Sequence, residues 1–339
     1  MKFLLIFLML CGLNSELLAQ ALNDECTGAS EVFLGTNAID TSDATNSLEE
    51  IPTSTCPGTA LGGVHGDVWY HFTPAEDGLM TITTCDTVDF DTDVIVYGGA
   101  CGSLIPISCH GDTAGCLVQG TTNNWNTTLE NVPVFVGETI LIRIGGYNDY
   151  DIGGGTFDIS MTSAPPPPPG APENDECSGA IEAVIGDNPI DTTSASDSID
   201  LYSSGTSCNA LGVMNQDVWY RWTAPGEGSL TVSMCDIVNF DTDLVIYLGD
   251  CISKVEVACS GDAPECQMQG NGASYASVVE GLQVSAGEEY LIRIGGWGDG
   301  QNGTGNVNVQ FVQSLIESLT LSSVPGSAEI DCEAVVSGP

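Results

Sequence analysis

Twelve cysteines occur as two sets of six, and the second set repeats the spacing of the first. Each cysteine of the first set has a counterpart 150 to 152 residues later in the chain. The first set is Cys26, Cys56, Cys85, Cys101, Cys109 and Cys116, and the second is Cys177, Cys208, Cys235, Cys251, Cys259 and Cys266. This regularity indicates an internal duplication, so the chain should contain two copies of one fold.

Six cysteines in each copy of an exported chain predict three disulfides per copy. A structural zinc site is disfavoured because no C-x-x-C spacing occurs. We expect three pairs in the first copy and the same three in the second. The expected pairs are Cys26–Cys56, Cys85–Cys116, Cys101–Cys109, Cys177–Cys208, Cys235–Cys266 and Cys251–Cys259.

The first 21 residues predict export. An apolar run over 3–10 follows Lys2, and the small-residue pattern Ala19-Gln20-Ala21 ends the segment, so residues 1–21 are expected to be a signal peptide. No later stretch is long and apolar enough to predict a membrane span. The chain should therefore be secreted or displayed on the cell surface. Cys332 has no counterpart and is expected to form an intermolecular disulfide or stay a free thiol.

A proline-rich segment separates the two copies. The sequence APPPPPGAP at 164–172 favours an extended, semi-rigid linker. We call residues 22–163 module one and residues 173–313 module two. The tail at 314–339 is too short to bury a core and is expected to begin a further module or to dock as a strand.

The chain is strongly acidic, with a formal net charge of −41. Beyond the predicted signal peptide, its lysines and arginines are Lys254, Arg143, Arg221 and Arg293. Like-charge repulsion therefore argues against nucleic acid and anionic membrane surfaces as partners. The acidity of the whole surface favours solubility, and local groups of acidic residues favour the binding of divalent cations.

The apolar pattern of each module is that of short strands. Residues 67–72, 79–85, 93–99 and 140–146 alternate apolar and polar side chains or run apolar between turn-forming residues. No stretch shows a helical apolar period. This pattern predicts an all-β fold, with two tandem jelly-roll-like β-sandwiches stapled by disulfides.

The order of motifs resembles a known family of exported modules. Each half reads NDEC, IDT, DVWY, FDTD, a cysteine-rich loop and then LIRIGG. This order resembles the bacterial pre-peptidase C-terminal (PPC-like) domain in its cysteine-rich tandem form. The resemblance implies a β-sandwich appendage to a secreted hydrolase or surface protein, some relatives of which bind collagen, polysaccharide or calcium. No catalytic domain accompanies the modules in this sequence.

The FDTD motif places two carboxylates at the start of a strand. Asp91 and Asp93 share one face, and three roles are open for them: organising the strand start, binding calcium, or acting as a glycosidase pair. The first role is favoured, with Asp91 bonded to loop backbone. Arg143 and Arg293, which lie inside apolar strands, are expected to pair with Asp91 and Asp241.

Acidic loops are the candidate calcium sites, because calcium takes oxygen ligands from carboxylates and carbonyls. The candidate ligands are Asp112, Asp149, Asp151, Asp262 and Asp299. The NDE motif at 23–25 and 174–176 also qualifies. The alternative is that these residues simply form turns.

Two aromatic residues suggest a binding surface. Tyr147 and Trp297 are counterparts that follow LIRIGG, next to the acidic loop residues, and exposed rings of this kind bind sugars by stacking.

No catalytic apparatus is repeated. The histidines, His65, His71 and His110, all lie in module one, and neither a G-x-S-x-G nor an H-E-x-x-H motif occurs. The sequence therefore predicts a non-catalytic binding or adhesion protein for extracellular polysaccharide or protein, with calcium as its one expected cofactor. The alternative is a structural spacer or accessory part of a larger surface protein or secreted hydrolase.

Overall fold

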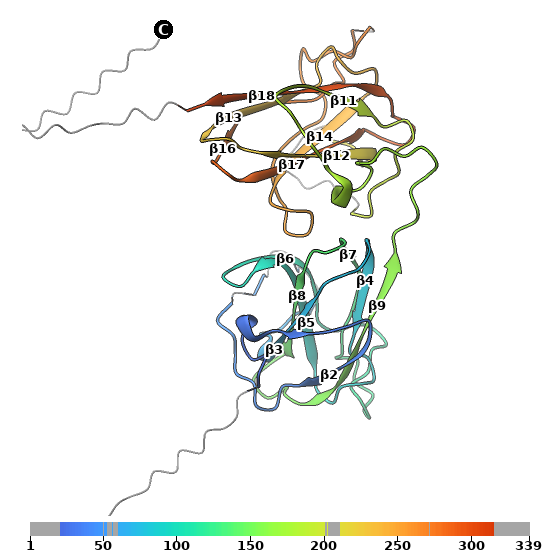
Figure 1. The fold of residues 1–339 in the computed structure, drawn as a ribbon. Coiled ribbons are helices and arrows are strands. Elements are labelled where there is room, and N and C mark those ends of the chain that lie inside the picture. The colour runs from blue at the N-terminus through green and yellow to red at the C-terminus, as the bar shows by residue number, and fades with distance from the viewer. Residues whose placement is uncertain are drawn as a thin grey trace, which may run out of the picture.

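The computed structural model describes residues 21–49, 51–52, 56, 60–200, 202, 211–270 and 272–314. The predicted signal peptide up to residue 20, Cys208, Cys332 and the tail from 315 onward lie outside this range. The strands form two sandwiches that repeat one topology, as the duplication predicts (Figure 1). The all-β fold is thereby confirmed.

In the first sandwich a five-stranded sheet in the order β1-β3-β8-β5-β6 packs on a four-stranded sheet in the order β2-β9-β4-β7. The elements are η1 (Cys26–Gly28), β1 (Ser30–Glu31), β2 (Gly35–Asp40), β3 (His65–Phe72), β4 (Gly78–Thr83), β5 (Thr92–Ala100), β6 (Ser103–His110), β7 (Thr128–Val134), β8 (Ile140–Gly146) and β9 (Gly154–Ser163). The four stretches predicted as strands correspond to β3, β4, β5 and β8.

The second sandwich has sheets in the orders β10-β12-β17-β14-β15 and β11-β18-β13-β16. Its elements are η2 (Cys177–Gly179), β10 (Ile181–Glu182), β11 (Gly186–Asp191), β12 (Asn215–Thr223), β13 (Gly228–Ser233), β14 (Thr242–Leu248), β15 (Val255–Ser260), β16 (Val278–Val284), β17 (Glu289–Gly296) and β18 (Thr304–Gln313). No helix in the described part of the chain is long and apolar enough to cross a bilayer.

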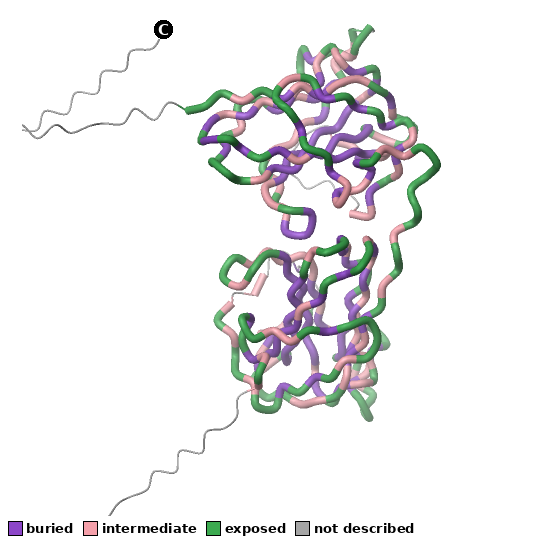
Figure 2. The backbone as a smooth tube through the Cα atoms, in the orientation of Figure 1, coloured by how far each residue is buried: buried purple, intermediate pink, exposed green. Residues whose placement is uncertain are grey.

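The five-stranded sheet of each module is buried on both faces, which explains its apolar strands. On β3, Val68, Tyr70 and Phe72 point into the sandwich core, whereas Trp69 points to the opposite face. A second, smaller core forms there, beneath the N-terminal segment of the module. Figure 2 shows these central strands buried between more exposed loops. Each module therefore has three layers: two sheets and a covering segment. In module one the covering segment consists of the described residues that precede β3 and lie outside β1 and β2.

A buried ion pair fastens the covering segment to the sheet. The guanidinium of Arg143 donates to both carboxylate oxygens of Asp67, at 2.9 and 3.1 Å, and to the carbonyl of Glu49 at 3.0 Å. Asp67 also accepts from the amide of Ser47, whose hydroxyl accepts from the Trp69 indole at 2.7 Å. Segment 47–49 is thus held against the sheet by charge-assisted hydrogen bonds.

The expected partners of the two arginines were wrong. Arg143 pairs with Asp67 rather than Asp91, and Arg293 pairs with Asp217 rather than Asp241, at 2.8 Å. Asp67 and Trp69 lie two residues apart on β3 and therefore face the same side of the sheet. Trp69 is paired with Arg143 on β8, so Asp67 lies diagonally across from the guanidinium.

Disulfides also hold the covering segment on the sheet. The structure joins Cys26 to Cys101, Cys56 to Cys109, and Cys177 to Cys251, so the expected pairs Cys26–Cys56, Cys101–Cys109, Cys177–Cys208 and Cys251–Cys259 were wrong. Cys101 lies in the turn before β6 and Cys109 lies near the far end of that strand, roughly 20 Å away, which no disulfide spans. Cys85–Cys116 and Cys235–Cys266 pair as expected, and Cys259 is also oxidised.

Removing one partner of the buried ion pair should destabilise a module strongly. We expect Asp67→Asn to lower the free energy of unfolding by about 3–5 kcal/mol, because the Arg143 charge is left buried without its counter-ion. Asp217→Asn should do the same in module two. Denaturant unfolding of the oxidised protein measures this. Asp149→Asn is the control, since the contacts of Asp149 with His65 and Asn46 are exposed to solvent. Equal effects of the three variants would contradict this account.

Candidate functional site

The start of β5 carries a group of acidic side chains that lies next to the covering segment. Asp93 is 1% exposed, and one of its oxygens accepts from the amide of Gly62 at 2.8 Å. The other oxygen of Asp93 and one oxygen of Asp91 are buried and have no hydrogen-bond partner. We call Asp91, Asp93 and the neighbouring Asp112 the acid site of module one.

Electrostatics shows that these carboxyl groups lie close together. Burial, together with the negative charges of Asp112 and Asp151, raises the pKa of Asp91 to about 7. Burial also raises the pKa of Asp93 to about 7, with contributions from Asp91 and Asp112. The structure therefore brings the predicted residues Asp112 and Asp151 together with the FDTD pair.

Module two repeats this arrangement. Asp243 is fully buried, accepts from the amide of Gly212 at 2.7 Å, and has a second oxygen without a partner, as does Asp241. Burial, together with the negative charge of Asp262, raises the pKa of Asp241 to about 6 and that of Asp243 to about 7. Asp241, Asp243 and Asp262 form the acid site of module two, where Gln301 replaces Asp151.

Exposed aromatic rings stand beside each acid site. Tyr147 is 47% exposed, and its carbonyl accepts from the amide of Gly63 at 2.9 Å, next to the Gly62 that binds Asp93. Trp125 is also 47% exposed, and its carbonyl accepts from the amide of Thr92, between the two aspartates. Backbone contacts therefore hold two solvent-facing rings at the same end of β5.

The counterparts in module two are Trp297 and Tyr275. Trp297 is 50% exposed, and its backbone amide donates to the carbonyl of Asp241 at 3.3 Å. Tyr275 is 49% exposed, and its backbone carbonyl accepts from the amide of Thr242. Trp125 and Tyr275 were not among the predicted site residues. Their common offset of 150 residues, which Tyr147 and Trp297 share, is the signal that marks them.

The remaining predicted ligands do not converge on a site. Asp149 contacts His65 at 2.5 Å and accepts from Asn46, and Asp299 is exposed. The NDE motif has a structural role. The side-chain amide of Asn23 donates to the carbonyl of Trp69, and the carbonyl of Asn23 accepts from the amide of Trp69. The carboxylate of Asp24 accepts from the hydroxyl of Thr45. Within the described ranges, no three His, Cys, Asp or Glu side chains are grouped closely enough to hold a metal ion among themselves.

The two acid sites lie at opposite ends of the molecule. The far end of β5 faces module two, where a side chain at Gly98 would lie 2.9 Å from the carbonyl of Ile252. Residue Cys251, beyond the end of β14, faces module one and donates its amide to Glu138 at 3.3 Å. The starts of both strands, which carry the acid sites, therefore point away from the contact between modules (Figure 1).

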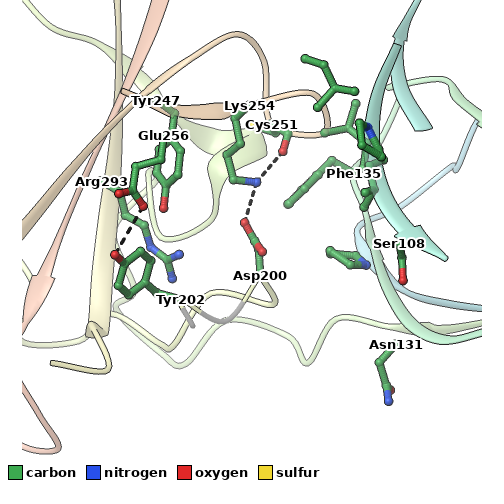
Figure 3. A pocket seen from close by; sticks show the side chains of 15 residues that line it. Ser108, Asn131, Phe135, Asp200, Tyr202, Tyr247, Cys251, Lys254, Glu256 and Arg293 are labelled. Atoms are coloured by element: carbon green, nitrogen blue, oxygen red, sulfur yellow. Dashed lines mark hydrogen bonds and ion pairs between the residues drawn. The ribbon is translucent and has the colours of Figure 1, made fainter. Parts of the chain in front are cut away.

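A cavity of about 400 Å³ lies between the modules (Figure 3). Its charged groups are already paired: Lys254 contacts Asp200 at 2.5 Å and the carbonyl of Cys251 at 2.6 Å, and Tyr202 donates to Glu256. The ammonium of Lys254 also lies 5.3 Å from the ring of Phe135 in module one. These contacts give the cavity a role in joining the modules, with few free polar groups for a ligand.

Comparison with known proteins gives a family for both modules. A family model described as "Galactose binding domain-like", whose name associates it with T9SS, matches residues 22–131 and 173–296. Comparison with curated proteins found no sequence match.

Solved structures with local similarity have low overall agreement. A Paenibacillus xanthan lyase is 12% identical with a TM-score of 0.20, over 74% of this chain and 23% of that one. A Podospora anserina GH26-CBM35 β-(1,4)-mannanase is 14% identical with a TM-score of 0.20, over 42% and 32%. The CUB1-EGF-CUB2 region of human MASP-1/3 is 8% identical with a TM-score of 0.22, over 82% and 99%. The chain thus spans less than a third of the first two proteins.

The contact between modules should weaken as pH rises. Burial raises the pKa of Glu138 to about 7 and that of Glu176 to about 8, so the folded state holds protons that the unfolded state releases near pH 4.5. Folding stability from these groups is therefore full below about pH 4.5 and lost as pH rises through 7 to 8. We expect the melting temperature to fall from pH 5 to pH 8, and to fall less in Glu138→Gln. The exposed Glu130→Gln is the control, and an equal effect of both variants would contradict this prediction.

Proposed function

Because the chain belongs to the family of galactose-binding-domain-like proteins over both modules, we propose that it is an exported, non-catalytic glycan-binding protein. The disulfides of both modules are typical of an exported chain. The observation that carries the proposal is the repeated site, in which two exposed aromatic rings flank buried carboxylates in each module. Rings held by backbone contacts can stack on the apolar face of a sugar at a low entropic cost.

The charge of the protein favours a neutral glycan. With a net charge of −41, the protein repels uronic acids and sulfated sugars, and the acid sites add negative charge near the rings. The family description names galactose, so a neutral, galactose-containing polysaccharide is the proposed ligand class. The free carboxylate oxygens of exposed acids such as Asp299 would accept hydrogen bonds from sugar hydroxyls.

The buried aspartates do not suit a hydrolase. A glycosidase pair must touch the glycosidic bond, whereas Asp93 is 1% exposed and Asp243 is fully buried. Their raised pKa values come first from this burial. The acid pair therefore supports a binding role rather than catalysis. A relationship to PPC-like modules, which are also appendages, leads to the same function.

The placement of the sites supports cross-linking. Two sites at opposite ends cannot engage one short oligosaccharide, but they can engage two chains or two distant parts of one polysaccharide. The second contact then becomes intramolecular and strengthens attachment. Adhesion between polysaccharide chains, or between polysaccharide and a cell surface, would be the result.

A structural spacer is the second candidate, and the joined modules favour it. Lys254, Phe135 and Glu138 make contacts across the boundary, and the proline linker accompanies them. On this alternative the rings bind nothing, and the protein holds other parts at a fixed distance.

Substituting the rings separates the two candidates. We expect the oxidised mature protein to bind and precipitate a neutral galactan in calcium-containing buffer. Tyr147→Ala and Trp297→Ala should each leave one working site, so binding persists and precipitation is lost. The double variant should lose binding as well. Affinity electrophoresis and turbidity measure the two properties.

Phe33→Ala is the matched control, because Phe33 is an exposed ring, 63% accessible, that lies outside the site. Unchanged binding in the Tyr147/Trp297 double variant would place the glycan elsewhere. Failure of the wild-type protein to bind any neutral glycan would leave the spacer function.

A further inference from the structure

Each acid site presents buried carboxylate oxygens that no protein group satisfies. We propose that the acid sites of module one and module two each bind one calcium ion, with Asp91 and Asp93 as ligands in the first and Asp241 and Asp243 in the second. Binding of the ion does not require the proposed glycan binding, so the two are tested separately.

The unsatisfied oxygens are the first argument. Asp93 and Asp243 are almost fully buried, and each uses one oxygen for a glycine amide while the other has no hydrogen-bond partner. A buried carboxylate oxygen without a partner is costly, and two neighbouring carboxylates add repulsion. That both modules keep this arrangement, although their sequences have diverged elsewhere, indicates a common partner for the oxygens.

Main-chain oxygen is available at the same place. A side chain on Gly111 would lie 2.5 Å from the carbonyl oxygen of Ala60 and 2.7 Å from the unpartnered oxygen of Asp93. Both oxygens therefore face the same backbone position, and the absence of a side chain at Gly111 permits their close approach. Since no three acidic side chains converge tightly within the described residues, the remaining ligands must be main-chain carbonyls and water. Calcium accepts such mixed sets of six to eight oxygens.

The chemistry of the site selects a hard cation. No nitrogen or sulfur ligand is common to the two sites, because His110, which lies beside Asp112, corresponds to Ser260 in module two, and this disfavours zinc and copper. The two nearby cations of the fold cannot neutralise it, because Arg143 and Arg293 are each paired with another aspartate. Calcium tolerates irregular geometry better than magnesium, which requires a near-ideal octahedron.

The test counts ions bound by the oxidised mature protein. Isothermal titration with calcium chloride after chelator treatment should give two equivalents per chain, with dissociation constants of about 10⁻⁴–10⁻³ M or tighter. Asp93→Asn and Asp243→Asn should each lose one equivalent, and the double variant should lose both. Asp149→Asn and Asp299→Asn are matched controls from the neighbouring loops and should keep two.

A measurement on the wild-type protein guards against misfolded variants. Terbium bound at these sites should luminesce when the nearby Trp125, Tyr275 and Trp297 are excited, and calcium should quench the signal by displacement. Absence of stoichiometric binding at millimolar calcium would overturn the proposal and leave the carboxyls protonated. Loss of binding in the Asp149 or Asp299 variants, with retention in Asp93→Asn and Asp243→Asn, would overturn it too. If calcium binds and galactan does not, only the proposed function fails.

Discussion

A buried ion pair, Arg143–Asp67 in module one and Arg293–Asp217 in module two, is the interaction on which the rest of each module depends. The guanidinium stacks on the ring of Trp69 at 5.5 Å while it binds Asp67 and the carbonyl of Glu49. A buried pair of this kind gains little over an apolar one, because desolvation offsets attraction. Its use here is to connect layers: it fixes a segment without regular structure onto a sheet that would otherwise expose an apolar face. The covering segment then places Ala60 and Gly62 against the start of β5, and so builds the acid site.

The fold could be predicted from the sequence because its signals are local or periodic. Near-continuous apolar runs along β3 and β5 indicate strands buried on both faces, and the cysteine offset indicates the duplication. The partners of Arg143 and Cys101 could not be predicted in this way. Both depend on long-range geometry, on the register between β3 and β8 in one case and on the length of β6 in the other. A residue pattern records that a side chain is buried, but it does not record what lies across from it.

The candidate site, like the fold, could be predicted only in part from the sequence. Placing Tyr147 and Trp297 beside acidic residues followed from their position after β8 and β17. The sequence favoured a loop-bonding role for Asp91, but Asp91 and Asp93 have buried oxygens without partners. Unsatisfied oxygens are invisible in a sequence, because FDTD reads the same whether or not the strand start is covered. The covering segment, which is far away in the chain, makes the difference.

The duplication has a consequence that a single module would not have. The modules meet through the ends of β5 and β14, so the contact occupies one end of each sandwich and leaves the acidic, aromatic end free. The residues at the contact have diverged between copies: Phe135 corresponds to Ser285, and Lys254 corresponds to Leu104. The residues at the free ends have been kept, as Asp91, Asp93, Trp125 and Tyr147 have acidic or aromatic counterparts. The residues have thus diverged where the two copies touch and have been kept at the two free ends. This pattern is expected when the two free ends perform the same task.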